Sequence, residues 1–203
     1  MNKISLRDMK KEATAHALSN AAFDLARERG LDGFVVEDVV QRAGYSRRTF
    51  ANHFSCMEEA VAAVVAFKNI NDAEQLLADL PDNVAPIDAL YQLLLTQITT
   101  GLLRKLQELV LLSKQNPTLE PYILNVFRGL QMAAQELVND LFEGRYPEGY
   151  SHLLVGAVYG AVLPVLDGSI NVLLPGQSTA GSPDAIAFEQ YLDTVFGYLR
   201  NGF

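Results

Sequence analysis

Two adjacent arginines and a nearby asparagine are the side chains best suited to specific chemistry in this sequence. Arg47, Arg48 and Asn52 lie within one short segment. A guanidinium can donate two hydrogen bonds to guanine O6 and N7, and a carboxamide can pair with adenine N6 and N7. Arginine pairs also occur as ordinary solvated surface, so the elements that position them must decide between the two interpretations.

The residues around this segment indicate a short helix, a tight turn and a second short helix, the order of a helix-turn-helix. The first helix is expected over residues 37–43, and Gly44 permits the turn. Ser46 is placed to cap a second helix over residues 47–53. A second helix with arginines near its N-terminus is equipped to enter a DNA major groove.

Aromatic residues can fix the second short helix against the first. Tyr45, Phe50 and Phe54 are the candidates for this packing. If Phe50 and Phe54 are buried, the outward face of the helix carries Arg47, Arg48, Ala51 and Asn52.

Charge is unevenly divided along the 203-residue chain, whose net charge is -8. Residues 1–55 hold nine Lys/Arg against seven Asp/Glu, whereas the remaining residues hold seven against seventeen. Phosphate binding needs local positive charge. We therefore expect a small, mildly basic N-terminal module joined to a larger acidic one.

Apolar residues recur at spacings of three and four in almost every long segment, which predicts an all-α fold class. A first helix is expected over residues 6–29, ended by Gly30, and a fourth from Ser55, as its N-cap, to about Leu80. Prolines and glycines divide the rest into expected helices over 86–114, 118–143, 148–174 and 184–201.

The apolar segment 153–174 is about as long as a bilayer is thick. Pro164, Asp167 and Asn171 argue against a membrane span, because a charge at that depth costs several kcal/mol. No apolar region follows a basic start to mark the chain for export, and the lone Cys56 fits a reducing cytoplasm. We expect a cytoplasmic protein with no membrane partner.

Small residues in this apolar segment suit close helix packing. Gly156 and Gly160 form a row that lets another helix approach closely. The spacing fits a subunit interface or an internal packing face and does not separate the two. Tyr191 and Val195 of the last expected helix complete the candidate dimer interface.

Residues of about 15–65 resemble the DNA-binding domain of the TetR family of transcriptional regulators. Ala21-Ala22 and residues 25–30 match its first helix, residues 37–44 its second and residues 46–54 its third, while residues 55–61 resemble the start of its fourth. The resemblance implies an all-helical homodimer, with a three-helix helix-turn-helix domain over residues 1–54 and a ligand-binding and dimerisation domain over residues 55–203.

The resemblance also implies a function and its site residues. It implies a transcriptional regulator, most commonly a repressor, that binds a pseudo-palindromic operator in double-stranded DNA and is released by a small molecule. By position, the two arginines and the asparagine face bases or nearby phosphates, while two hydroxyl residues and a histidine hold the DNA backbone. The candidate DNA-binding residues are Tyr45, Ser46, Arg47, Arg48, Thr49, Asn52 and His53.

Three positions depart from the family pattern. Val35 stands where a capping threonine is usual, Ala51 where an aromatic ring is common and Met57 where a lysine is usual. These departures weaken the implied DNA contacts. Basic residues at the start of the chain can compensate by following the DNA backbone, namely Lys3, Arg7, Lys10 and Lys11.

The C-terminal region places a few polar side chains among Leu, Val and Ile, a mixture that small-molecule pockets use. Each polar residue taken singly also fits an ordinary core or surface position. Lys and Arg are scarce there, which favours an apolar or aromatic effector. The candidate ligand-binding residues are Tyr91, Gln97, Tyr122, Asn125, Tyr159 and Asn171.

An enzyme is not expected from this sequence. His16, His53 and His152 are far apart and fall in no metal-binding pattern, and no glycine-rich phosphate loop occurs. We therefore expect no catalytic residue, metal or cofactor. The alternative to a regulator is a helical ligand-binding or scaffold protein whose DNA reader is degenerate.

Overall fold

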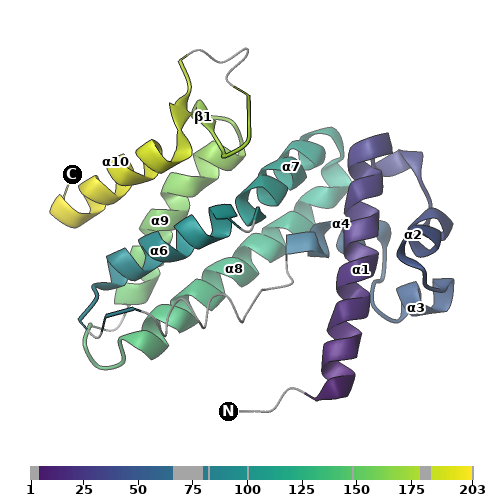
Figure 1. Ribbon diagram of the computed structural model, residues 1–203, viewed down its shortest axis with the longest axis horizontal. Coiled ribbons are helices and arrows are strands. Elements are labelled where there is room, and N and C mark those ends of the chain that lie inside the picture. The colour runs from purple at the N-terminus through teal and green to yellow at the C-terminus, as the bar shows by residue number, and fades with distance from the viewer. Residues whose placement is uncertain are drawn as a thin grey trace. The chain divides into compact units, whose positions relative to one another are not determined.

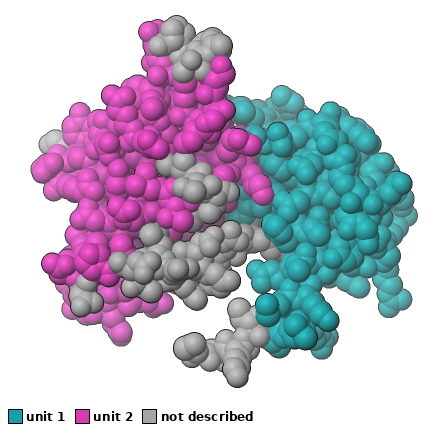
Figure 2. All heavy atoms as spheres, viewed as in Figure 1, with its two compact units in different colours: residues 1–68, 108–127 teal, residues 69–107, 128–203 magenta. Residues whose placement is uncertain are grey.

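A computed structural model describes residues 5–65, 80–81, 83–99, 101–147, 149–178 and 184–202, with the backbone alone for residues 97–99. The described chain is almost entirely helical (Figure 1), which confirms the expected all-α fold class. Its residues form two compact units, which Figure 2 shows in different colours. The expected domain boundary between residues 54 and 55 stays a prediction.

Unit 1 contains Met1–Lys68 and Glu108–Phe127. The second of these ranges includes the later part of α7 (Leu102–Gln115) and the first part of α8 (Glu120–Leu141). Its other helical elements, of which those marked η are short 3-10 helices, are α1 (Leu6–Arg29), η1 (Leu31–Gly33), α2 (Val36–Ala43), α3 (Arg47–Ala51), α4 (Met57–Ala62), η2 (Ala63–Val65) and η3 (Pro117–Leu119).

The long first helix has the bounds expected from the sequence. The Ser5 hydroxyl caps it by accepting a hydrogen bond from the Asp8 amide at 3.2 Å. The helix ends at Gly30, whose φ of 75° favours glycine. Its buried face, which includes Leu18 and Leu25, packs in the core of unit 1 together with α2 and α4.

The expected N-cap of α4 is wrong by one residue. The Cys56 sulfur, and not the Ser55 hydroxyl, accepts the hydrogen bond from the Glu59 amide, at 3.4 Å. Ser55 instead donates from both its amide and its hydroxyl to the Glu59 carboxylate, each at 2.6 Å. The Ser55 hydroxyl is thus hydrogen-bonded to the Glu59 carboxylate and does not cap the helix. The expected continuation over residues 66–79 lies outside the described residues.

Unit 2 contains Asn69–Gln107 and Arg128–Phe203. It holds the remaining parts of α7 and α8 and, in full, α6 (Pro86–Thr99), α9 (Tyr150–Leu166), β1 (Val172–Leu173), β2 (Ile186–Ala187) and α10 (Phe188–Asn201). The core of this unit includes Phe188, Leu192 and Phe196 of α10, all buried. Arg200 of α10 forms an ion pair with Asp88 of α6 at 2.7 Å.

Two expected helices of this region are shorter in the structure. The helix expected over residues 86–114 is divided into α6 and α7 at Gly101, whose φ is 74°. The helix expected over residues 148–174 ends at Leu166, because Asp167 accepts a hydrogen bond from the Ser169 amide and Gly168 turns the chain. No helix among the described residues has both the length and the apolar character to cross a membrane.

A small parallel strand pair follows α9 and was not expected. Val172 pairs with Ile186 and Leu173 with Ala187. Each strand has two residues, too few for the alternation of apolar and polar residues by which a strand is recognised in a sequence. The pair joins the segment after α9 to the residues that lead into α10.

Candidate nucleic-acid interface

The helix-turn-helix expected from the sequence is present in unit 1. α2 ends at Ala43, and Gly44 adopts the left-handed conformation, with φ 75° and ψ 30°. The amides of Gly44 and Tyr45 both donate to the Val40 carbonyl, which closes the turn. A side chain at Gly44 would be strained because L-residues rarely adopt this backbone conformation.

Apolar side chains fix α3 beneath its exposed face. Val39 of α2, Phe50 of α3 and Phe54 are buried, and the two phenyl rings lie 5.6 Å apart. This confirms the expected burial of Phe50 and Phe54. Tyr45, expected to help in the packing, is 38% exposed.

The N-termini of the two short helices are capped differently. Ser46 accepts a hydrogen bond from the Thr49 amide at 3.1 Å, which confirms it as the N-cap of α3. The hydroxyls of Ser46 and Thr49 also lie 2.8 Å apart. At α2, the Val35 side chain has no acceptor, but the Val35 amide donates to the Asp38 carboxylate at 2.9 Å. The start of α2 is therefore held by the side chain of Asp38, which accepts from the N-cap residue, and not by the side chain of the N-cap residue itself.

The side chains on the outer face of α3 are exposed. Arg47, Arg48, Ala51 and Asn52 share this exposed face. The helix ends at Ala51, two residues earlier than expected, and Asn52 is its C-cap. His53 follows in the turn and is half-buried, with its ring 6.2 Å from that of Phe54.

The two arginines differ in their surroundings. The Arg47 guanidinium donates a hydrogen bond to the Glu37 carboxylate of α2 at 2.8 Å. Both side chains are more than half exposed, so water weakens this ion pair. Arg48 forms no ion pair with any other described residue. Glu37 was not singled out in the sequence, because a contact between residues ten positions apart depends on the turn between the helices.

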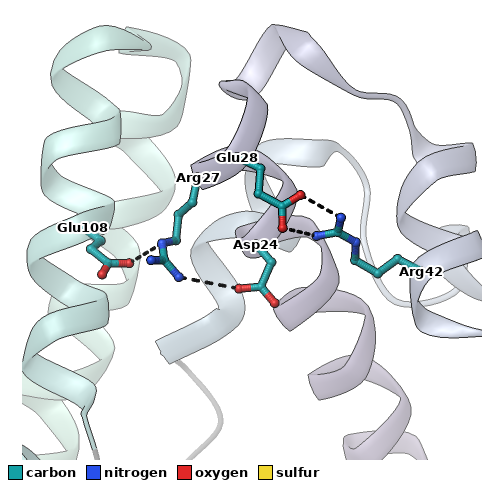
Figure 3. A network of polar contacts seen from close by, with 5 residues as sticks. All are labelled: Asp24, Arg27, Glu28, Arg42 and Glu108. Atoms are coloured by element: carbon teal, nitrogen blue, oxygen red, sulfur yellow. Dashed lines mark hydrogen bonds and ion pairs between the residues drawn. The ribbon is translucent and has the colours of Figure 1, made fainter.

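A network of ion pairs fastens α1 to the elements around it (Figure 3). Arg42 of α2 donates two hydrogen bonds to the Glu28 carboxylate of α1, at 2.8 and 2.7 Å. Arg27 of α1 lies 2.8 Å from Glu108 of α7 and 3.9 Å from Asp24. The hydrogen bonds from Arg42 lower the pKa of the Glu28 carboxyl and raise that of the Arg42 guanidinium.

A buried hydrogen bond joins α1 to α4. The Ser19 hydroxyl donates to the Ala60 carbonyl at 2.7 Å, and both residues are fully buried. Because a buried hydroxyl without a partner is costly, this bond keeps the two helices in one register. It was not foreseen, since a serine within a helix is an unremarkable residue in the sequence.

The expected ligand-binding residues are divided between the two units. Tyr122 and Asn125 belong to unit 1, while Tyr91, Tyr159 and Asn171 belong to unit 2. The side chain of the sixth, Gln97, lies outside the described residues. Neither unit by itself therefore contains the whole expected set, whose ligand contacts stay a prediction.

Several of these residues already have partners within the chain. The Cys56 sulfur and the Tyr122 hydroxyl share a hydrogen bond at 3.1 Å, and the interaction with Cys56 raises the pKa of Tyr122. The Tyr91 hydroxyl donates to Asp193 at 2.6 Å, which raises the pKa of Tyr91. Burial raises the pKa of Tyr159 to about 12. Asn125 and Asn171 are exposed.

The glycines of α9 lie on a face that has no packing partner at these positions among the described residues. A Cβ atom added at Gly156 or Gly160 would meet no described atom within 4 Å. Leu153 and Leu163 on the same face are 78% and 37% exposed. Among the residues that the structure describes, no side chain or backbone atom therefore packs at these two glycines, and their part in a subunit interface or in internal packing stays a prediction.

The other two expected interface residues lie on α10. Tyr191 donates its hydroxyl to the Ala161 carbonyl at 2.7 Å, and so ties α10 to α9 within the chain. Val195 is half-buried one turn further on. Their part in a dimer stays a prediction.

Comparison with known proteins identifies the region that forms the helix-turn-helix. Residues 18–64 match the model of a family described as bacterial regulatory proteins, tetR family. This range contains α2, the turn, α3 and α4, together with the buried part of α1. No curated protein matches the chain.

Two solved structures share the fold over nearly the whole chain. A transcriptional regulator from Rhodococcus sp. Rha1 is 21% identical, with a TM-score of 0.50, and the match covers 93% of this chain and 96% of that one. A proposed TetR-family transcriptional regulator from Mesorhizobium loti is 16% identical, with a TM-score of 0.56, and the match covers 95% and 97%. The C-terminal region thus also has a fold known from such proteins.

Proposed function

We propose that this chain, whose N-terminal region belongs to the tetR family of bacterial regulatory proteins, is a ligand-responsive transcriptional regulator that binds DNA. It binds a pseudo-palindromic operator as a homodimer, acts as a repressor and leaves the operator when a small, largely apolar effector binds. Residues 1–54 read DNA, and residues 55–203 bind the effector and dimerise. The regulator works in the cytoplasm.

One observation carries the DNA-binding part of this proposal. α3 is a short helix that starts at a serine cap and exposes Arg47, Arg48 and Asn52 together, on a region that matches the family. These are the side-chain types that read guanine and adenine in the major groove. Ser46, Thr49, His53 and Tyr45 lie beside them and are proposed to contact the DNA backbone.

The exposed face of α9 supports the dimer. From Leu153 to Leu163 the helix carries no charged side chain, and its outer face presents Gly156, Ala157 and Gly160. Small residues let the same helix of a second copy approach closely, and an isologous contact of this kind closes a twofold dimer. A dimer places two α3 helices on half-sites about 34–36 Å apart, one turn of B-DNA.

The response to effector is proposed to act through the spacing of the two α3 helices. The Ser19 to Ala60 hydrogen bond holds α4 to α1, so a displacement of α4 carries the helix-turn-helix with it. An effector releases the operator only if it binds the displaced state more tightly than the DNA-bound state. A thermal-shift screen tests the effector class: apolar and aromatic compounds should raise the melting temperature, and stabilisation by anionic metabolites alone contradicts the proposal.

A binding titration on DNA tests the reader. Fluorescence anisotropy with a duplex from the chain's own promoter region compares the wild type with the Arg47→Ala, Arg48→Ala double variant. Two lost bidentate contacts should weaken binding by roughly 100-fold or more. Arg128→Ala removes an exposed arginine from α8 and should leave the affinity unchanged.

The outcomes of this titration separate the candidate functions. Unaltered binding by the double variant refutes α3 as the reader. If the wild type binds neither its promoter region nor any fragment in a genome-wide pull-down, the alternative gains: a helical ligand-binding or scaffold protein with a degenerate reader. The departures at Val35, Ala51 and Met57 are the observation that favours this second candidate.

A further inference from the structure

The first turns of α1 extend beyond the core of unit 1. Every side chain from Ser5 to Ala13 is exposed, and we call this segment the α1 arm. Leu18 is the first residue of the helix that is fully buried. With a rise of 1.5 Å per residue, Arg7 lies about 16 Å along the helix axis from Leu18. Figure 1 shows the N-terminal turns of α1 extending past α3.

The α1 arm is an ordered helix although it buries no side chain. The Ser5 hydroxyl accepts from the Asp8 amide and donates to the Asp8 carboxylate, so the N-terminus is capped. No proline or glycine interrupts α1 between Leu6 and Arg29. The direction of the arm is therefore fixed by the part of the same helix that packs in the core with α2 and α4.

Basic side chains share one side of the α1 arm. Arg7, Lys10 and Lys11 have spacings of three and four, which bring side chains together on one face of a helix. Asp8 and Glu12 lie on the neighbouring side. The arm thus presents three positive charges close together. All three side chains are exposed and contribute nothing to the core of the unit.

The ion pairs of the region show which cations are available to a partner. Four of its arginines are paired with carboxylates, namely Arg27, Arg29, Arg42 and Arg47. The positively charged side chains without an ion pair among described residues 5–55 are Arg7, Lys10, Lys11 and Arg48. Three of these four lie on the α1 arm, and the fourth is on the face of α3 proposed to read DNA.

We propose that the α1 arm is a second DNA-binding surface, which holds the phosphate backbone beside the site read by α3. This inference rests on the proposed function. Phosphates are the complementary partner because they are dense, fixed negative charges, and both surfaces belong to one compact unit. The arm adds affinity without reading sequence, since phosphate contacts position a protein on DNA and base contacts specify the site.

The test compares the wild type with an Arg7→Gln, Lys10→Gln, Lys11→Gln variant on two duplexes, the promoter fragment and one of random sequence. Each lost phosphate contact should reduce the slope of log affinity against log salt by about 0.9. We expect the variant to bind both duplexes roughly 10- to 100-fold more weakly at moderate salt. The ratio between the two affinities should stay unchanged.

Matched controls separate this effect from loss of structure or of overall charge. Lys10→Gln alone is compared with Arg128→Gln, which removes the same charge from an exposed site on α8. Only Lys10→Gln should weaken binding. Because the arm buries nothing, the triple variant should keep the melting temperature and helical circular dichroism of the wild type.

The remaining outcomes are decisive. If the wild type binds DNA and the triple variant keeps its affinity and salt slope, the α1 arm is not a phosphate-binding surface. A change in the affinity ratio between the duplexes overturns the backbone-only role. Loss of binding to anionic phospholipid vesicles, with DNA binding intact, assigns the arm to a membrane surface instead. If the wild type binds no DNA at all, the failure lies with the proposed function.

Discussion

The helix-turn-helix region and α9 present opposite kinds of surface. The first exposes Arg48 and Asn52, with further cations on the α1 arm, whereas α9 exposes Leu153 and Gly160 and carries no charge between Leu153 and Leu163. A cationic surface suits phosphate. An apolar surface with small residues suits another protein surface of the same kind. The unpaired side chains among the described residues thus fit the partner proposed for each region.

Glycine also has a different physical role in the two regions. Gly44 is required by its own backbone, since φ 75° and ψ 30° strain any residue with a Cβ atom. Gly160 lies within a helix, where glycine costs about 1 kcal/mol relative to alanine. No atom described in the structure needs the space at Gly160. A second copy of the chain approaching this face would use that space, which is the basis of the proposed dimer.

The largest expected effect follows from placing a charge on the α9 face. Gly160→Arg should convert the dimer to a monomer, because an arginine cannot be buried there without a partner. The two half-sites are then bound independently, and we expect operator affinity to fall by about 100-fold or more. Sedimentation equilibrium measures the assembly, and fluorescence anisotropy measures the affinity.

The control for this variant is Gly129→Arg, an identical change at an exposed helical glycine of α8 where an added Cβ also meets nothing. It should remain a dimer. Both changes replace glycine with a better helix former, so neither should unfold its helix. A dimeric Gly160→Arg protein with full operator affinity removes α9 from the interface.

A smaller effect is expected at the ion pair of α3. Glu37→Gln releases Arg47 and removes a negative charge near the proposed DNA surface. Because exposed ion pairs contribute at most about 1 kcal/mol, operator affinity should rise about 2- to 5-fold. Asp32→Asn removes the same charge from an exposed site on η1. Equal gains from both variants show that net charge alone matters and that Glu37 does not restrain Arg47.

Where one residue decides a feature, the sequence predicted it well. α1 has the expected bounds because a serine cap and a terminal glycine mark its ends, and Gly44 and Ser46 shape the turn and the start of α3 as expected. The error at Ser55 has a definite cause. Ser55 with Glu58 and Cys56 with Glu59 have identical spacing, and in the structure the Glu59 carboxylate accepts from Ser55 while the Glu59 amide donates to Cys56.

Features that join distant residues could not be predicted from spacing. The Arg47 to Glu37 and Arg27 to Glu108 ion pairs depend on how helices meet, and no local pattern marks them. The candidate DNA-binding residues come from one continuous segment, residues 45–53, whose turn and short helix have local signals in the sequence. The candidate ligand-binding residues were chosen by type from several helices, and the structure divides them between two units.

The smallest expected effect is on thermal stability and concerns the ion pair between Arg42 and Glu28. The helix-turn-helix is fastened to α1 partly by the Arg42 to Glu28 ion pair, which depends on pH, whereas the exposed face of α9 has no such pair. Glu28→Gln keeps the size of the side chain and removes its charge. The pair is exposed, so the melting temperature should fall by only about 1–3 °C at pH 7.

The pH dependence gives this prediction a direction. The Glu28 pKa is lowered in the folded protein from its ordinary value of 4.5, so its stabilising effect is present above that value and is lost as the pH falls through the folded pKa. The difference in melting temperature between the wild type and Glu28→Gln should therefore shrink below about pH 4. Glu136→Gln on α8 is exposed and unpaired among the described residues, and should melt like the wild type at pH 7. A difference that persists unchanged at acid pH means that the side chain acts through packing and not through its charge.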